Sequence, residues 1–505
     1  MNLSTFLAHH GLVANPFRAE EARQDDVFAR IERDFRHPDF EKICGDLSRP
    51  ASAVVFGERG SGKTAMRMQM LRRIREHNDR ERGERCLGVA YDDFDGMLRA
   101  FERSTGISDP VRLLDRLTLA DHMDGILHRV VPALVDRVLD DPARDGGVAL
   151  DLEEDAARQM RQLDRRARHD LLLLQALYDR PEDAAMRTGR LRKALRLPAS
   201  DALPLILFGT AAFGLVFFVI LIWSLVSPPE SRIWAWNTAI VVLGIVAAAL
   251  GGIGGWITLR RVAAARRLHA ALRVVGRPSS SFRASLAELG SEDALEERLP
   301  TGSDDEPRFA MFRRLMGVLH GLDHAGLLVI VDRVDEPTLV SGDPGRMRAL
   351  IWPVFSAKFL AQEGFGVKLL LPLELRSMLA RESNEFFRAA RLDKQNLVER
   401  LTWPGAVLYD LCTARLAACR ADGAAPISPS ALFEESMRPQ DIVDALDQLQ
   451  QPRDAFKFLY ACIQEHCGAT PEESPSFRIP RALFDAVRRR QVERSQGILR
   501  GERAG

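Results

Sequence analysis

The sequence predicts an α/β core with a parallel sheet, a two-helix membrane hairpin inserted into that core, and a helical C-terminal domain. Three observations lead to this prediction. A short apolar run, Ala53 to Phe56, ends in a glycine-rich loop and is followed by helical patterning. A second apolar run, Leu328 to Val331, ends in acidic residues. Between the two runs lie two long stretches without charged residues, Leu203 to Val226 and Trp236 to Leu259.

The size and composition of the chain set broad limits. A chain of 505 residues is too long for one ordinary core, so we expect roughly two or three folded units. The 70 Lys and Arg residues are balanced by 70 Asp and Glu residues, whereas nucleic-acid-binding domains are usually basic. The six cysteines form no Cys-x-x-Cys pair and have no zinc-site spacing, which favours reduced cytosolic thiols. The composition therefore carries no strong nucleic-acid signal.

The elements of the core follow from the spacing of apolar residues. Short runs rich in branched residues predict buried strands, and longer runs with helical spacing predict amphipathic helices. The predicted strands are 53–56, 87–91, 327–331 and 367–371, and the predicted helices are 63–77, 111–140, 260–273, 308–322 and 405–500.

These elements define the expected domain organisation. Pro, Ser, Gly and acidic residues between 276 and 307 predict a linker or mobile insertion. The predicted regions are an N-terminal region (1–50), the first part of the core (51–150), a helical stalk (151–199), the membrane hairpin (200–260, with helices 203–226 and 236–259), a basic helix and linker (261–307), the second part of the core (308–405) and a helical lid or C-terminal domain (406–505).

The two apolar stretches are each long enough to cross a bilayer, which takes about 20 residues in a helix. A buried hairpin in a soluble core is the alternative, but buried soluble helices rarely run this long without charge. Arginines and one lysine flank the pair on its outer sides, and positive flanks stay in the cytoplasm. We therefore expect a two-pass protein of the bacterial inner membrane with both termini in the cytoplasm. The flanking basic residues are Arg190, Arg192, Lys193, Arg196, Arg260, Arg261, Arg266 and Arg267.

Two further patterns fit a membrane hairpin. Tryptophans near the predicted interfaces would place their rings at the headgroup layer. Small residues spaced four apart would let the helices approach closely, more simply within one chain than between chains. The tryptophans are Trp223, Trp234, Trp236 and Trp256, and the small residues are Gly244, Ala248, Gly251, Gly252 and Gly255.

The glycine-rich loop has the spacing of a phosphate-binding loop, G-x-x-x-x-G-K-[ST], between a predicted strand and a predicted helix. Its glycines permit backbone angles that turn successive N–H groups toward one phosphate, and the helix N-terminus adds positive partial charge. Lys63 would reach the β- and γ-phosphates, and Thr64 would bind Mg²⁺. A chance glycine-rich turn is the alternative, which the strand and helix on either side disfavour. The loop is Gly57-Glu58-Arg59-Gly60-Ser61-Gly62-Lys63-Thr64.

The acidic residues after the second run complete a two-part site. Asp332 would hold the Mg²⁺ shell, usually through water. Either Asp335 or Glu336 would orient the attacking water, and we favour Glu336 without excluding Asp335. A buried strand that runs into an acidic turn would explain these residues equally well by themselves. Paired with the glycine loop, they predict a site for ATP and Mg²⁺ and a P-loop NTPase core of the additional-strand type. A GTPase is disfavoured because the chain has no Asn-Lys-x-Asp motif.

At these residues the chain resembles a known group of proteins. The segment Val331 to Glu336 is similar to the strand-plus-acid motif of STAND and NACHT ATPases. A membrane hairpin between the two nucleotide motifs resembles the KAP family of P-loop NTPases, as do Leu392-Asp393-Lys394 and Leu401-Thr402-Trp403-Pro404. Gln451-Pro452-Arg453 is similar to the Pro-Arg lid element of STAND and AAA+ proteins. The resemblance covers about residues 50–95 and 325–465.

The resemblance implies a catalytic arginine, and at one place the chain departs from the pattern of the related ATPases. Transition-state charge in phosphoryl transfer is balanced by arginine, and Arg453 is the first candidate, followed by Arg376 and Arg415. Related ATPases place a polar sensor after the fourth strand, where this chain has Pro372 to Arg376. Nucleotide binding is therefore expected more firmly than hydrolysis.

Three functions follow from these patterns. The first is a membrane-anchored ATPase that couples Mg-ATP binding and hydrolysis to a conformational or assembly switch; the resemblance suggests signalling, membrane-associated assembly or phage defence. The second is a nucleotide-binding membrane scaffold with little hydrolysis. The third is an effector whose oligomerised hairpins perturb the bilayer. The expected partners are nucleotide, the lipid bilayer, and further copies of the chain or another protein.

Overall fold

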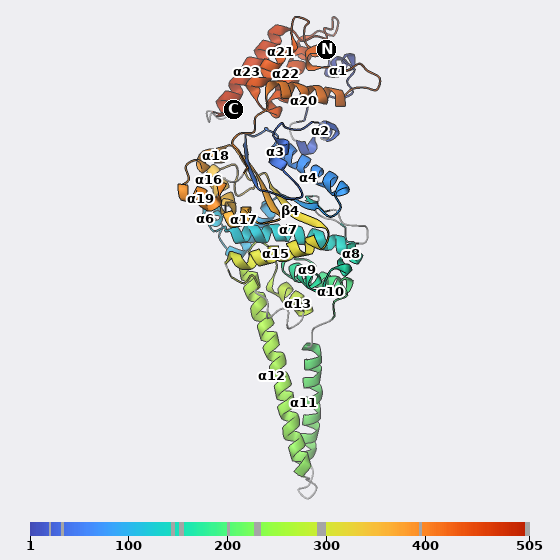
Figure 1. Cartoon of the computed structure of the whole chain (residues 1–505), viewed down its shortest axis with the longest axis vertical. Coiled ribbons are helices and arrows are strands. Elements are labelled where there is room, and N and C mark those ends of the chain that lie inside the picture. The colour runs from blue at the N-terminus through green and yellow to red at the C-terminus, as the bar shows by residue number, and fades with distance from the viewer. Residues whose placement is uncertain are drawn as a thin grey trace. The chain divides into compact units, whose positions relative to one another are not determined.

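The computed structural model shows a chain built from two compact units. The first unit contains Met1–Glu81, Gly88–Asp92 and Leu327–Gly505, and the second contains Arg82–Leu87 and Asp93–Gly326. Figure 1 labels the elements along the chain. The structure describes residues 1–19, 22–31, 35–142, 147–150, 156–198, 203–226, 234–289, 299–302, 304–392 and 396–499.

A six-stranded sheet has the order β3-β2-β4-β5-β1-β6. β5 lies between β1 and β4 and pairs with both in parallel, with Val55 opposite Leu370 and Val329 opposite Val367. These strands are buried along almost their whole length, which explains their continuous apolar sequences. Each of the four predicted strands is observed, and each is slightly longer than predicted. The strands are β1 Ala53–Gly57, β2 Arg85–Tyr91, β3 Val148–Ala149, β4 His324–Val331, β5 Phe365–Pro372 and β6 Asn396–Val398.

The order of the strands positions the candidate site. Because β1 and β4 are both parallel to β5, their carboxyl ends lie at one edge of the sheet. The loop that follows β1 therefore lies near the acidic residues that follow β4, although the two segments are far apart in the sequence. Ligands of open parallel sheets bind at this edge. In the strand order, β5 lies between β1 and β4.

The first unit also contains a helical body at the C-terminal end of the chain, which the N-terminal residues join. Phe6 in α1 is completely buried, and Val13 N–H donates to Cys419 O at 2.9 Å. Apolar side chains of α1, α20, α21, α22 and α23 form one core, which also takes in Trp403. The helices of the first unit are α1 Leu3–His9, η1 Ala22–Gln24, α2 Asp26–Ile31, α3 Phe40–Cys44, α4 Lys63–Arg80, α16 Pro344–Ile351, η3 Trp352–Val354, α17 Ala357–Leu360, α18 Glu374–Leu379, α19 Asn384–Ala390, α20 Gly405–Ala418, η5 Pro429–Leu432, α21 Pro439–Leu449, α22 Pro452–Ala469 and α23 Arg481–Leu499.

The second unit is mainly helical. The charged region expected to form a stalk contains three helices, α8, α9 and α10, and the four leucines 171–174 of α9 are buried. α9 packs against α7, α10, α13 and α15. The region 276–307 was expected to be a linker, but it contains the helix α13, which buries Phe282 and Leu286. Residues 290–298 and 303 of this region lie outside the described residues. The helices of this body are α5 Asp95–Thr105, α6 Pro110–Leu114, α7 Leu119–Leu139, α8 Ala156–Gln162, α9 Arg165–Tyr178, α10 Ala184–Ala194, α13 Ser279–Leu289 and α15 Asp305–His320.

The hairpin consists of α11 Leu203–Val226 and α12 Trp234–Ala271, which lie side by side (Figure 1). Both are long and apolar enough to cross a membrane: mean hydropathy is 2.8 over Pro204–Trp223 and 2.0 over Val241–Ala271. α12 continues without a break into the basic helix predicted after Leu259.

Some of the small residues lie between the two helices, as expected for packing within one chain. A Cβ at Gly244 would lie 3.1 Å from Phe217, and one at Gly251 would lie 3.4 Å from Thr210. Gly252 and Gly255 meet no atom within 4 Å. Trp256 is half exposed, and the Arg260 guanidinium lies 4.1 Å from its ring centroid, an arrangement suited to a membrane interface. The side chains of Trp234 and Trp236 lie outside the described residues.

Candidate functional site

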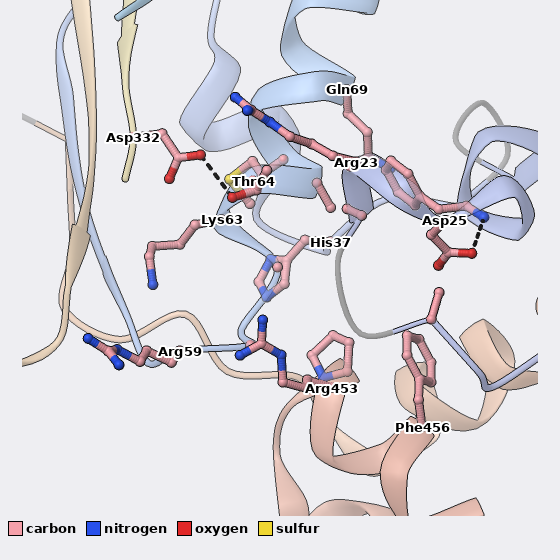
Figure 2. A pocket seen from close by; sticks show the side chains of 18 of the residues that line it. Arg23, Asp25, His37, Arg59, Lys63, Thr64, Gln69, Asp332, Arg453 and Phe456 are labelled. Atoms are coloured by element: carbon pink, nitrogen blue, oxygen red, sulfur yellow. Dashed lines mark hydrogen bonds between the residues drawn. The ribbon is translucent and has the colours of Figure 1, made fainter. Parts of the chain in front are cut away.

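A cavity of about 670 Å³ lies in the first unit, next to the carboxyl ends of β1 and β4. Its walls come from the glycine loop, the loop after β4, the N-terminal segment and the C-terminal helices. Lys63, Arg59 and Arg453 lie at one end of it, and Asp25 and Phe456 lie at the other (Figure 2). The cavity is within the size range of small-molecule and cofactor sites, about 300–1,000 Å³.

The glycine loop disfavours side chains at its three glycines, through backbone conformation at Gly60 and Gly62 and through lack of space at Gly57 and Gly60. Gly60 and Gly62 have φ angles of 91° and 93°, in the left-handed region that favours glycine. A Cβ at Gly57 would lie 2.4 Å from Ser61 Oγ, and one at Gly60 would lie 2.7 Å from the Arg453 Cβ. α4 begins at Lys63 directly after Gly62, so its N-terminus faces the loop. The loop therefore joins β1 to α4 through two glycines in the left-handed region.

Lys63 is held by the loop itself. Its Nζ donates to Gly57 O at 2.7 Å and to Glu58 O at 2.8 Å. Burial lowers the pKa of Lys63, while the nearby carboxylates of Asp332 and Asp335 act in the opposite direction. Ser61 Oγ is buried and has no hydrogen-bond partner in the described part of the chain. A ligand with acceptor oxygens, such as a phosphate, would satisfy both groups.

Thr64 and Asp332 meet although 268 positions separate them in the sequence. Thr64 Oγ1 donates to Asp332 Oδ2 at 2.9 Å (Figure 2). Burial raises the pKa of the Asp332 carboxyl, and Arg67 and the Thr64 hydrogen bond oppose this shift. The described residues include no group of three or more His, Cys, Asp or Glu side chains that could hold a metal. One carboxylate and one hydroxyl fit Mg²⁺, which keeps several waters and binds ligand phosphates, better than a metal that needs a complete protein cage.

Asp335 and Glu336 both line the cavity, and both contact arginines. Arg59 Nε lies 3.3 Å from Asp335 Oδ2, and Arg333 pairs with Glu336. Arg333 has a φ of 61°, an uncommon conformation for a residue with a side chain and one that clusters at functional sites. The geometry does not separate the two acids, so the choice between them stays a prediction.

The arginine candidates are in three different surroundings. Arg453 lines the cavity in the first turn of α22, and its N–H donates to Gly60 O at 3.4 Å. Arg376 pairs with Glu399 and does not line the cavity. Arg415 is buried at the far end, where its Nη1 lies 2.6 Å from Asp25 Oδ2. Of the three, Arg453 is the one next to the glycine loop.

Three hydrogen bonds connect the loop to residues near the C-terminal helices. The Glu58 carboxylate accepts hydrogen bonds from Arg400 and from Gln451, which comes directly before α22. Trp403 Nε1 donates to Ser61 O at 2.9 Å. Trp403 belongs to the segment 401–404, one of the two short segments that resemble the KAP family. In the other, 392–394, residues 393 and 394 lie outside the described residues.

The far half of the cavity combines apolar side chains with the Arg415–Asp25 ion pair and was not foreseen from sequence. Phe28, Ile31 and Phe456 line it, and the Arg415 guanidinium lies 4.3 Å from the Phe456 ring centroid. The N-terminal wall is held by Arg415, whose Nε donates to Pro16 O at 2.6 Å across 399 positions. No local signal in the sequence marks these residues, because they meet only through tertiary packing.

Comparison with known proteins finds no relative of this chain. The chain matches no protein-family model, no curated protein sequence and no solved structure. The chemistry of the site is therefore argued from its residues and their geometry.

Proposed function

We propose that this chain is a membrane-anchored P-loop ATPase, with a core of the additional-strand type, that binds Mg-ATP in the cavity of the first unit. The observation that carries the proposal is the contact between Thr64 and Asp332 behind the glycine loop. The sequence predicts these two residues, independently and from different motifs, as the Mg²⁺ ligands. Their contact is the arrangement that a shared metal would need.

The phosphates of ATP would lie against the glycine loop and the N-terminus of α4. Successive backbone N–H groups and the helix dipole favour anions there. Lys63 would exchange its two carbonyl acceptors for phosphate oxygens, and Ser61 Oγ would gain a partner. Mg²⁺ would supply positive charge to neutralise the phosphates and would be held by Thr64 and Asp332. The apolar half of the cavity, with Phe28 and Phe456, suits a nucleobase.

Hydrolysis needs an acid that orients water and a cation that balances transition-state charge. Glu336 is our first choice for the acid, with Asp335 as the alternative, and Arg453 is our choice for the cation. Hydrolysis would couple to a conformational or assembly switch because Gln451 and Arg453 connect the loop to α22. The hairpin would anchor the chain in the inner membrane of a bacterium with both termini in the cytoplasm. Signalling and phage defence are functions that such a switch would suit.

A nucleotide-binding scaffold with little hydrolysis is the second candidate. It is favoured by the ion pairs that hold both candidate acids, Asp335 with Arg59 and Glu336 with Arg333. In that case the acids would stay paired when nucleotide is bound, and the chain would respond to ATP without turning it over.

The test is to measure Mg²⁺-dependent ATP binding and hydrolysis by the detergent-solubilised full-length chain. Lys63→Ala is expected to lower both by at least about 100-fold, because the lysine contacts the phosphates in ground and transition states. Glu336→Gln is expected to retain binding and to lose turnover. Lys358→Ala and Glu363→Gln, which change exposed residues, are the matched controls.

The outcomes separate the candidates. Binding without turnover in the wild-type chain favours the scaffold. Turnover that survives Glu336→Gln but not Asp335→Asn moves the catalytic role to Asp335. A wild-type chain that binds no Mg-ATP refutes the proposed function.

A further inference from the structure

A layer of buried charge lies directly behind the candidate Mg²⁺ carboxylate. Arg67, on α4 one turn after Thr64, has its Nε 3.5 Å from Asp332 Oδ2. The same guanidinium pairs with Asp92 through Nη1. All three side chains are buried. Arg67 and Asp92 do not line the cavity, and Arg67 is connected to it through Asp332.

The position of Asp92 follows from the sheet. Asp92 is the first residue after β2, and β2 is the neighbour of β4. The Asp332 N–H donates to Tyr91 O at 3.4 Å, so the two strand ends are adjacent. Asp92 is thus brought next to the acidic residues that follow β4.

A guanidinium in this place creates an electrostatic problem for a metal site. Arginine cannot lose its proton in a protein, so Arg67 carries a full positive charge beside the carboxylate that would bind Mg²⁺. Away from water, charges a few ångströms apart interact strongly. An unbalanced Arg67 would repel Mg²⁺ and compete with it for Asp332. Asp92 supplies the negative charge that balances Arg67.

We propose that Asp92 is a positioning residue for Mg²⁺: it binds and neutralises Arg67, and thereby leaves the Asp332 carboxylate available to the metal. The inference rests on the proposed Mg-nucleotide function. It assigns a role to a buried ion pair that the nucleotide motifs do not include. Arg23, from the N-terminal segment, also pairs with Asp92 and is more exposed than Arg67.

The test is to titrate Mg²⁺ into the full-length chain at a fixed, subsaturating ATP concentration and to measure bound ATP. Asp92→Asn removes the balancing charge and is expected to raise the Mg²⁺ concentration at half-maximal binding by roughly tenfold or more. ATP binding in the presence of EDTA should not weaken. Asp92→Glu should restore the wild-type midpoint to within a few fold.

A double variant separates charge balance from a merely structural role. In Arg67→Gln/Asp92→Asn the uncompensated cation is gone, so the Mg²⁺ midpoint should return toward the wild-type value. If Asp92 only supported the fold, the double variant would be at least as impaired as Asp92→Asn. Asp79→Asn, which removes one exposed carboxylate from the last turn of the same helix, is the control and should not move the midpoint.

Each result decides the question. An unchanged midpoint in Asp92→Asn, or a double variant no better than the single one, overturns the inference and leaves the proposed function intact. A wild-type chain that binds no Mg-ATP overturns the proposed function and this inference with it. If Asp92→Asn fails to fold while the double variant folds and has the wild-type Mg²⁺ midpoint, the result supports charge balance.

Discussion

The two units each contain a cluster of buried aspartate and arginine, and the two clusters differ in what surrounds them. In the first unit, Asp332 stands between a cavity and the Arg67–Asp92 pair. In the second unit, Asp124 and Arg308 are enclosed, with side-chain exposures of 0% and 1%. The same residue types therefore occur at a cavity wall and inside a closed helical body.

The second-unit cluster has protein partners for its charges. Asp124 accepts from Tyr178 at 3.0 Å and from Arg308 Nε at 3.1 Å. Arg308 also donates to Asp304 O and to Ala271 O, each at 3.1 Å. These bonds join α7, α9 and α15 to the last residue of α12. Such a network holds the helices in place and is closed to solvent at Asp124 and Arg308.

The comparison shows that burial of charge does not by itself identify a binding site. What distinguishes the first-unit cluster is that one carboxylate, Asp332, reaches a cavity beside a loop with an unsatisfied Ser61 hydroxyl. Buried charges whose partners are all protein atoms stabilise packing, whereas those beside a cavity can exchange partners with a ligand. Three predictions test this distinction, in order of decreasing effect.

Arg308→Ala should strongly destabilise the protein. It removes the cation beside the buried Asp124 carboxyl, which must then take up a proton or stay charged without its partner, and breaking a buried pair in this way costs about 3–5 kcal/mol. Arg313→Ala, on the same helix but exposed and paired with exposed Glu306, should cost no more than about 1 kcal/mol. Denaturant unfolding of the detergent-solubilised chain measures both. Equal losses in the two variants would show that the enclosed cluster does not hold the helices.

The free energy of unfolding of the wild-type chain should decrease as the pH rises from about 4 to about 7. Asp124→Asn should abolish this decrease. Burial raises the pKa of Asp124 to about 7, against the opposing effect of Arg308. Because the folded-state pKa lies above the unfolded value, the folded chain binds this proton more tightly. The contribution is complete below the unfolded pKa and is lost as pH rises through 7, at a rate of up to about 1.4 kcal/mol per pH unit. Parallel pH profiles of wild type and variant would contradict the assignment.

Arg23→Ala should have the smallest effect. Its side chain is 42% exposed, and Asp92 keeps its buried partner Arg67 when Arg23 is removed. The expected loss of stability is within about 1 kcal/mol, as for other exposed ion pairs. A loss as large as that of Arg308→Ala, measured in the same unfolding experiment, would mean that the two clusters are equally structural.

Much of the core was predictable because its signals are local. The apolar runs before Gly57 and Asp332 predicted β1 and β4, and the loop spacing predicted the turn into α4 at Lys63. The absence of charge from Leu203 to Val226 predicted α11. The packing of the charged region after 151 was harder to predict, since α9 and α10 bury leucines and contact helices, α13 and α15, that follow much later in the chain.

The sequence by itself determined the strands, the glycine-rich turn into α4 and the two long apolar helices, because periodicity, glycine placement and hydropathy act within a few residues. Only the tertiary structure decided which distant groups meet. It placed Asp92 against Arg67, and the N-terminal segment along the cavity through Arg415. These contacts depend on strand order and on packing between segments up to hundreds of residues apart, for which a local pattern carries no signal.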